Sequence, residues 1–136
     1  MYVSDIKDAR TARFRVGRSS VWVDAEDVLI YRMRIYDTVP ENLPLFHEFF
    51  REHLLPVQLR HGARLIGRWE ADDGRVVAIW EYDDRSAYER IEAAVRSDPD
   101  SSKARQRRAQ LPPLITAQEE TFMESTVPGD VAPSRV

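Results

Sequence analysis

The sequence predicts a single small α+β domain in which helices cover one face of a four-stranded antiparallel sheet. Three observations predict this class. The chain has 136 residues, of which 43% are hydrophobic and 32% charged, which is enough apolar material for one core. Segments with strand and helix periodicity follow one another over residues 28–125. An Asp-Gly turn joins the two middle strand segments, as is typical of a β-hairpin.

The first strand is predicted over residues 28–36, VLIYRMRIY, which are β-branched and aromatic. Alternation divides its side chains between two sheet faces, with Leu29, Tyr31, Met33 and Ile35 on one and Arg32, Arg34 and Tyr36 on the other. The Arg34 and Tyr36 face is too mixed for a dry core and too aromatic for a solvated surface. We therefore expect the helices to leave this face uncovered, and a second copy of the chain to cover it.

Residues 40–62 have apolar side chains at helical spacing. Gly62 is expected to end this helix, and Pro56 to kink or break it locally. The remaining elements follow in order: strands over 63–71 and 75–83, a helix over 84–97, a short helix to about 110 and a last strand over 114–124.

Local signals support these boundaries. Ser86 and Glu89 match an S-x-x-E capping box, and Asp98 and Pro99 suit the N-cap and first position of the short helix. The last strand is more polar than the others, which favours a place near the sheet edge. The order is that of a ferredoxin-like βαββαβ fold.

The two ends of the chain are less regular. Residues 1–27 form an N-terminal extension in which FRV and VWV flank GRSS, so that it is either a hairpin or a mobile arm. Residues 126–136 are rich in Pro, Gly and Ser and are expected to form a flexible C-terminal tail.

Composition argues against several functional classes. The net charge of −3 gives no reason to expect nucleic acid as a partner, and no apolar run reaches the ~20 residues that span a membrane. The chain has no cysteine, which excludes disulfides and thiolate catalysis. It has no Gly-rich phosphate loop and no zinc or calcium motif, so we expect no cofactor. The first residues lack the apolar core of a signal peptide, and a cytoplasmic location is expected.

Several stretches resemble the NIPSNAP family of the dimeric α/β-barrel superfamily. They are RMRIY at 32–36, FREHLLPVQLRHG at 50–62, ARLIGRW at 63–69, AIWEYDDRSAYE at 78–89, SDP at 97–99 and AQEE at 117–120. The sequence departs from the family pattern at Arg32, where the family has Glu, and at Ser101, where it often has Trp.

The resemblance implies a ferredoxin-like domain over 28–125 that pairs into a homodimeric α/β barrel. The wider superfamily includes cofactor-independent monooxygenases, lactone isomerases, haem-degrading enzymes and binding proteins. Fold analogy alone does not choose among these.

Three side chains are candidates for catalysis: His53, Arg34 and Glu119. His53 lies where the Pro56 kink could open the helix toward the sheet, and Arg34 and Glu119 could place polar groups in an apolar pocket from different strands. An ion pair within the sheet or between subunits is the alternative for these two. His47 and His53 are about 120° apart on a helix, and none of the histidines matches a metal-ligand spacing.

Five aromatic side chains are candidates for ligand binding: Tyr31, Tyr36, Trp69, Trp80 and Tyr82. They lie either in the core or dimer interface, or in the wall of an apolar pocket between sheet and helices. In the basic segment KARQRR at 103–108, Arg105 and Arg108 share one side of a helix, and Lys103 and Arg107 another. A solvated helix face is the expectation there.

Two functional hypotheses remain open. The first is an enzyme that acts on an apolar, aromatic or polyketide-like molecule by cofactor-independent oxygenation or isomerisation. The second is a non-catalytic binding or scaffold dimer. Haem binding through a helix histidine is a distant third.

Overall fold

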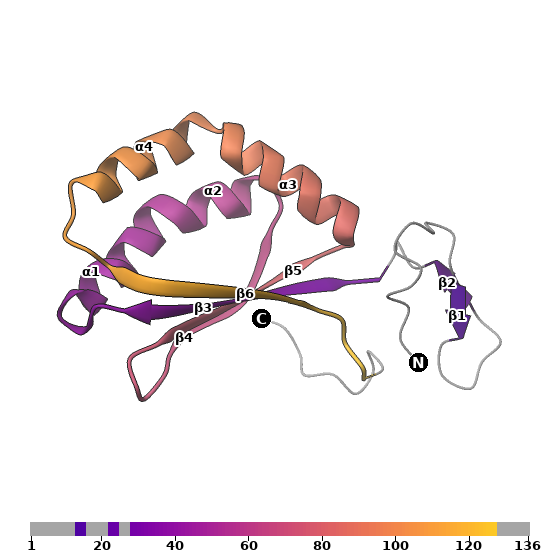
Figure 1. The fold of residues 1–136 in the computed structure, drawn as a ribbon. Helices are drawn as coiled ribbons and strands as arrows, with labels where there is room; N and C mark the ends of the chain where they lie inside the picture. The colour runs from indigo at the N-terminus through magenta and orange to yellow at the C-terminus, as the bar shows by residue number, and fades with distance from the viewer. Residues whose placement is uncertain (1–12, 16–21, 25–27, 128–136) are drawn as a thin grey trace.

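The computed structural model describes residues 13–15, 22–24 and 28–127 (Figure 1). Its elements are β1 (Arg13–Arg15), β2 (Trp22–Asp24), β3 (Ile30–Thr38), a 3₁₀ turn (Pro40–Asn42), α1 (Leu43–Phe49), a π-helical turn (Phe50–Leu54), α2 (Leu55–Arg60), β4 (Arg64–Glu70), β5 (Val76–Tyr82), α3 (Arg85–Ser97), α4 (Pro99–Ala109) and β6 (Ile115–Met123).

The four long strands form one antiparallel sheet in the order β4-β5-β3-β6. All the helices lie on the same side of this sheet, and its other side is left open (Figure 1). This arrangement confirms the predicted α+β class with ferredoxin-like order. It also confirms that the last strand, β6, lies at an edge.

Two glycines turn the chain where the sequence predicts. Gly62 follows α2 with φ = +103°, and Gly74 closes the β4–β5 hairpin with φ = +87°, a region that L side chains rarely adopt. The predicted capping box is wrong. The carboxylate of Asp84 accepts the backbone N–H of Ala87 at 2.7 Å and begins α3, because Asp84 is extended while Ser86 is already helical.

The N-terminal segment contains a short antiparallel pair, in which Arg13–Arg15 lies against Trp22–Asp24. The residues between and around these two strands, including the GRSS stretch, lie outside the described residues. Most of the predicted tail, from residue 128 on, also lies outside them.

The predicted assignment of the two sheet faces is wrong. Tyr36 packs edge-on against Phe46 of α1, with ring centroids 5.4 Å apart, and the Arg32 guanidinium lies 3.8 Å from the Glu92 carboxylate of α3. Arg34 shares their face by alternation. The side chains expected on the uncovered face therefore face the helices, and α3 supplies the Glu92 carboxylate and the Tyr88 ring to Arg32.

The open face of the sheet is the apolar one. Its central side chains are only partly buried, and Trp69 is 50% exposed. By strand register this face carries Tyr31, Met33, Ile35, Trp69, Val77 and Ile79. Gly67 lies on the same face, where the Trp69 indole folds over it and occupies the space of a β-carbon.

A π-helical turn lets the first helix continue past Pro56. In this turn the backbone N–H of Leu55 bonds to the carbonyl of Phe50, five residues back. Proline has no N–H, and in an α-helix its ring collides with the carbonyl four residues back, here that of Glu52. The wider turn relieves this conflict, so that α1, the π-helical turn and α2 run without a break.

The core between sheet and helices has two parts. One is built around Phe46, Phe49, Val76, Ala104 and Leu114, and the other around Phe50, Ala63, Trp80 and Tyr82. Leu54, in the π-helical turn, packs against both parts. The turn that accommodates Pro56 therefore also joins the two halves of the core.

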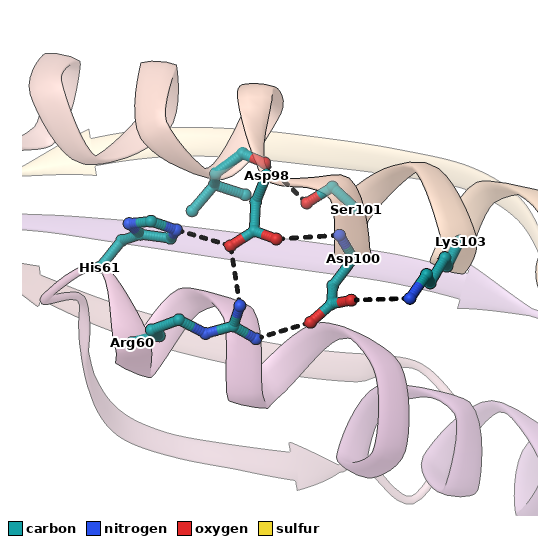
Figure 2. A network of polar contacts seen from close by, with 7 residues as sticks. Arg60, His61, Asp98, Asp100, Ser101 and Lys103 are labelled. Carbon is teal, nitrogen blue, oxygen red and sulfur yellow. Dashed lines mark hydrogen bonds and ion pairs between the residues drawn. The ribbon is translucent and has the colours of Figure 1, made fainter.

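Asp98 ties the end of α2 to the junction of α3 and α4 (Figure 2). Its Oδ2 accepts hydrogen bonds from Arg60 Nη1 at 2.9 Å and from His61 Nε2 at 2.8 Å, while Oδ1 accepts the backbone N–H of Asp100 at 2.8 Å. The side chain is 6% exposed. The same carboxylate thus caps α4, as predicted, and holds a second helix.

These contacts stabilise the ionised form of Asp98. The hydrogen bond from His61 is the largest cause, followed by that from the Asp100 N–H, and together with the nearby Arg60 charge they lower the pKa of the Asp98 carboxyl below its ordinary value. A group with a lowered pKa in the folded state stabilises the fold above its unfolded pKa of about 3.9. That stability is lost as the pH falls through the lowered value.

We expect an Asp98→Asn protein to melt at a lower temperature than the wild type at pH 7, because asparagine keeps the cap but loses the charged pair. The difference should shrink as the pH falls below about 4. Thermal melts followed by circular dichroism between pH 3 and pH 8 measure it. Asp100→Asn is the control, since its exposed contacts should matter less at every pH. A pH-independent difference would contradict the assigned role of the charge.

Candidate functional site

Three arginines lie on the covered face of the sheet, Arg32 and Arg34 in β3 and Arg68 in β4. Ala78 of β5 pairs with Arg34 on one side and with Arg68 on the other, so only a methyl group separates these two across the sheet. Strand spacing puts their backbones about 10 Å apart. The helix-facing surface of the sheet is therefore cationic at its centre.

Arg32 is the fully paired member of the row. Its Nε donates to Glu120 Oε2 at 2.6 Å, and its guanidinium lies over the Tyr88 ring, 5.4 Å from the centroid. Burial disfavours its charge, but hydrogen bonding to Tyr82 and Glu120 outweighs burial and raises the pKa of the guanidinium. Burial conversely raises the pKa of the Tyr82 and Tyr88 hydroxyls. Arg32 therefore acts as a fixed positive charge.

Arg34 is only partly satisfied. Its Nη2 donates to Gln118 Oε1, and its guanidinium lies over the Tyr36 ring, 5.3 Å from the centroid. Its Nε is 3.9 Å from Glu120, the carboxylate that already bonds to Arg32. This Nε is buried and has no hydrogen bond among the described residues. Buried donors of this kind are rare in proteins, and a bound ligand is one explanation.

Arg68 lies between two aromatic rings and one histidine. Its guanidinium is 4.8 Å from the Phe46 centroid and 4.3 Å from that of Phe50, and Nη1 donates to His47 Nδ1 at 2.8 Å. Since arginine only donates, His47 accepts at Nδ1 and carries its proton on Nε2, which donates to Glu70 at 2.9 Å.

The rest of the Arg68 guanidinium has no partner among the described residues. Both Nε and Nη2 are buried and unbonded there. Burial is the main cause that lowers the pKa of Arg68. A buried cation without a carboxylate is costly, and it is suited to receive an anionic or strongly polarised oxygen.

A cavity of about 240 Å³ lies among the π-helical turn, α3 and α4. Its walls combine apolar and charged side chains: Phe49, Leu54, Glu92, Val95, Arg96, Ser101, Ala104, Arg105 and Arg108. Glu92 connects this cavity to the arginine row, because its carboxylate lies 3.8 Å from Arg32. The volume is slightly below the usual 300–1,000 Å³ of ligand pockets, so only a small molecule fits.

The structure separates the predicted catalytic residues. Arg34 lies on the covered face, whereas Glu119 pairs with Ile35 and lies on the open face. The carboxylate beside Arg34 is that of Glu120, its neighbour in sequence. His53 is partly buried and packs against Phe49, a cavity residue, with ring centroids 5.3 Å apart. Arg34 and His53 remain on the helix side of the sheet, and Glu119 does not.

The predicted aromatic set divides in the same way. Tyr36, Trp80 and Tyr82 lie on the covered face, and Tyr82 packs edge-on against Tyr88 at 5.1 Å. Tyr31 and Trp69 lie on the open face. The hydroxyl of Tyr31 donates to Glu81 at 2.8 Å.

Sequence reasoning missed Arg68, His47 and Glu92. A β-bulge between Leu65 and Gly67 shifts the alternation in β4, so the face of Arg68 could not be read from its spacing. For His47 the sequence predicts only a surface or helix-end histidine, since it has no metal-ligand spacing. The sequence does contain one signal for the arginine row: Arg32 and Arg34 occupy alternate positions within an otherwise apolar strand.

No group of three or more His, Asp or Glu side chains within the described ranges is placed to hold a metal ion. The helices described for this chain include none that is both long and apolar enough to cross a membrane.

The sheet order and the one-sided helix layer define a ferredoxin-like α+β protein with three arginines on the sheet face that the helices cover. The NIPSNAP family model matches residues 31–128, nearly three quarters of the chain, and the protein belongs to the NIPSNAP family. No curated protein matches it.

Solved structures agree with this assignment. A NIPSNAP-like domain protein from Burkholderia xenovorans is 24% identical, with a TM-score of 0.66 over 81% of this chain and 93% of its own. A NIPSNAP domain protein from the same organism is 27% identical, with a TM-score of 0.63 over 77% and 99%. A candidate antibiotic biosynthesis monooxygenase from Bacteroides thetaiotaomicron shares the fold at 17% identity, with a TM-score of 0.57 over 76% and 95%.

We expect Arg68→Met to raise the free energy of unfolding by roughly 1 kcal/mol or more, because it replaces a buried, incompletely bonded cation with an apolar side chain. Urea denaturation measures it. Arg64→Met is the matched control on the same strand. Arg64 Nε donates to the buried Glu81 at 2.8 Å, and its loss should cost about 1–3 kcal/mol. A destabilised Arg68→Met protein would show that the Arg68 donors are satisfied.

Proposed function

We propose that this NIPSNAP protein binds a small apolar or aromatic metabolite in the cavity among the π-helical turn, α3 and α4. One observation carries the proposal: a cavity with apolar and charged walls adjoins, through Glu92, the buried Arg32, which shares a sheet face with Arg34 and Arg68. Ligand pockets typically combine apolar walls with a few polar groups that fix orientation.

The same geometry supports cofactor-independent monooxygenation or isomerisation of that metabolite. Both reactions begin with removal of a proton, from a carbon next to a carbonyl or from a phenol hydroxyl, which gives an enolate or a phenolate. In the oxygenation, O2 then oxidises this anion, with one oxygen atom inserted and the other released as water together with two hydrogens of the substrate. Arg34 is suited to stabilise such an oxyanion, because its buried Nε is fixed and shielded from water. His53 is the candidate base, since it packs on a cavity residue. The fold shared with a candidate monooxygenase supports this direction.

A non-catalytic binding or scaffold dimer is the second candidate, and the open sheet face favours it. Its apolar side chains are continuous across three strands, with Trp69 half exposed. An exposed apolar patch of this kind marks an interface. We propose that a second copy of the chain covers it in a homodimer.

We expect native mass spectrometry of the purified protein to show a dimer carrying excess mass from a retained small molecule. Arg34→Gln should reduce the retained fraction if the metabolite reaches the arginine row, because the buried Nε donor of Arg34 is lost. An Arg75→Gln protein should keep it, since Arg75 bonds to Asp73 in the exposed hairpin turn. A ligand-free wild type would count against metabolite binding. Once the ligand is identified, loss of its turnover in a folded His53→Gln or Arg34→Gln protein would establish an enzyme, and loss of affinity alone a binder.

We expect Trp69→Lys to shift the protein from dimer to monomer, because it places a charge in the proposed interface and removes a large exposed apolar side chain from it. Analytical ultracentrifugation at several concentrations measures this. Leu59→Lys is the control: Leu59 is also 50% exposed but lies on α2, on the other side of the sheet. A Trp69→Lys protein that remains dimeric would place the interface elsewhere.

A further inference from the structure

The structure sorts the basic side chains of α4 into two groups. Lys103 pairs with Asp100 at 3.6 Å (Figure 2), and Arg107 donates to Gln110 at 3.4 Å. Arg105 and Arg108 line the cavity instead. Neither guanidinium has a hydrogen bond or ion pair with any other described residue. The two arginines without local partners are thus the two at the cavity.

The cavity is cationic in an acidic protein. Its lining holds three arginines and one glutamate, a formal charge of +2, whereas the whole chain carries −3. The glutamate is already engaged, because Glu92 lies 3.7 Å from Arg96 and 3.8 Å from Arg32. The charges of Arg105 and Arg108 are therefore not neutralised within the cavity.

The other walls are apolar. Phe49 is the last residue of α1, and Leu54 is the last residue of the π-helical turn. Val95 comes from α3 and Ala104 from α4. Phe49 and Ala104 are buried members of the core. A ligand here meets hydrocarbon on the inner side and guanidinium groups at the helix surface.

We propose that this cavity binds a small amphipathic carboxylate, with its hydrocarbon part against Phe49, Leu54 and Val95 and its carboxylate held by Arg105 and Arg108. This inference rests on the proposed function and names its ligand class. Arginine forks match a planar carboxylate, and the volume of about 240 Å³ limits the apolar part to a short chain or one ring.

The test compares two probes of equal length, octanoate and 1-octanol, by isothermal titration calorimetry on the full chain. We expect octanoate to bind about fivefold or more tightly than octanol, as one or two exposed charge pairs provide. The preference should fall at 1 M salt, where charges are screened beyond about 3 Å.

Variants assign the effect to the cavity. An Arg105→Gln, Arg108→Gln double variant should lose the preference for octanoate and keep the affinity for octanol. Arg107→Gln, on the same helix, should change neither. Val95→Trp should fill the cavity and abolish both, with circular dichroism confirming that the protein is folded.

Three outcomes overturn the inference. Equal affinity for the two probes would remove the carboxylate preference and leave the proposed function standing. A preference for octanoate that persists in the double variant, or octanoate binding that persists in Val95→Trp, would place the site elsewhere. If neither probe binds, the ligand class is wrong; the mass of ligand retained by the purified protein then decides the proposed function separately.

Discussion

The burial of arginines between sheet and helices is the constraint on which the rest of this structure depends. A guanidinium on the covered face requires partners from the layer above it, and the helices supply them. Glu92 and Tyr88 of α3 contact the Arg32 guanidinium, and the rings of Phe46 and Phe50 contact the Arg68 guanidinium. Because these partners are incomplete at Arg34 and Arg68, the layer that stabilises the fold also contains buried N–H donors that have no hydrogen bond among the described residues.

Several of the stretches that resemble the NIPSNAP family contain residues that hold the helices together and turn the chain. In the RHG and SDP stretches, Arg60, His61 and Asp98 form one network that fixes α2 to the α3–α4 junction. Gly62 then turns the chain into β4. A family can conserve such a network across different ligands, and membership by itself therefore defines the scaffold. The residues that could differ in function, such as Arg105 and Arg108, lie outside these stretches.

The sequence was sufficient to predict the strands and helices, but not which face of the sheet the helices cover. Periodicity and turn residues predicted every strand and helix of the sheet domain, since these signals are local. Alternation separated Arg34 from Met33, but could not say which of the two lies under the helices, because that depends on partners distant in sequence. The carboxylate beside Arg34 is that of Glu120 and not that of Glu119, one position away. Because adjacent residues of a strand point to opposite faces, Glu119 lies on the other face of the sheet. The cavity was not predictable for the same reason, as its walls come from three separate segments.

Because of the π-helical turn, the contacts of the first helix depend on the exact number of residues between α1 and α2. A π turn is equivalent to one residue added to an α-helix, and each residue rotates the helix by about 100°. Loss of a single residue between Phe50 and Leu54 would rotate Phe46 and His47 away from Arg68, or else turn Val57 out of the core, and would bring the Pro56 ring against a backbone carbonyl. A one-residue deletion in this segment would therefore disturb contacts on both sides of the turn, whereas a substitution there leaves the helix phase unchanged.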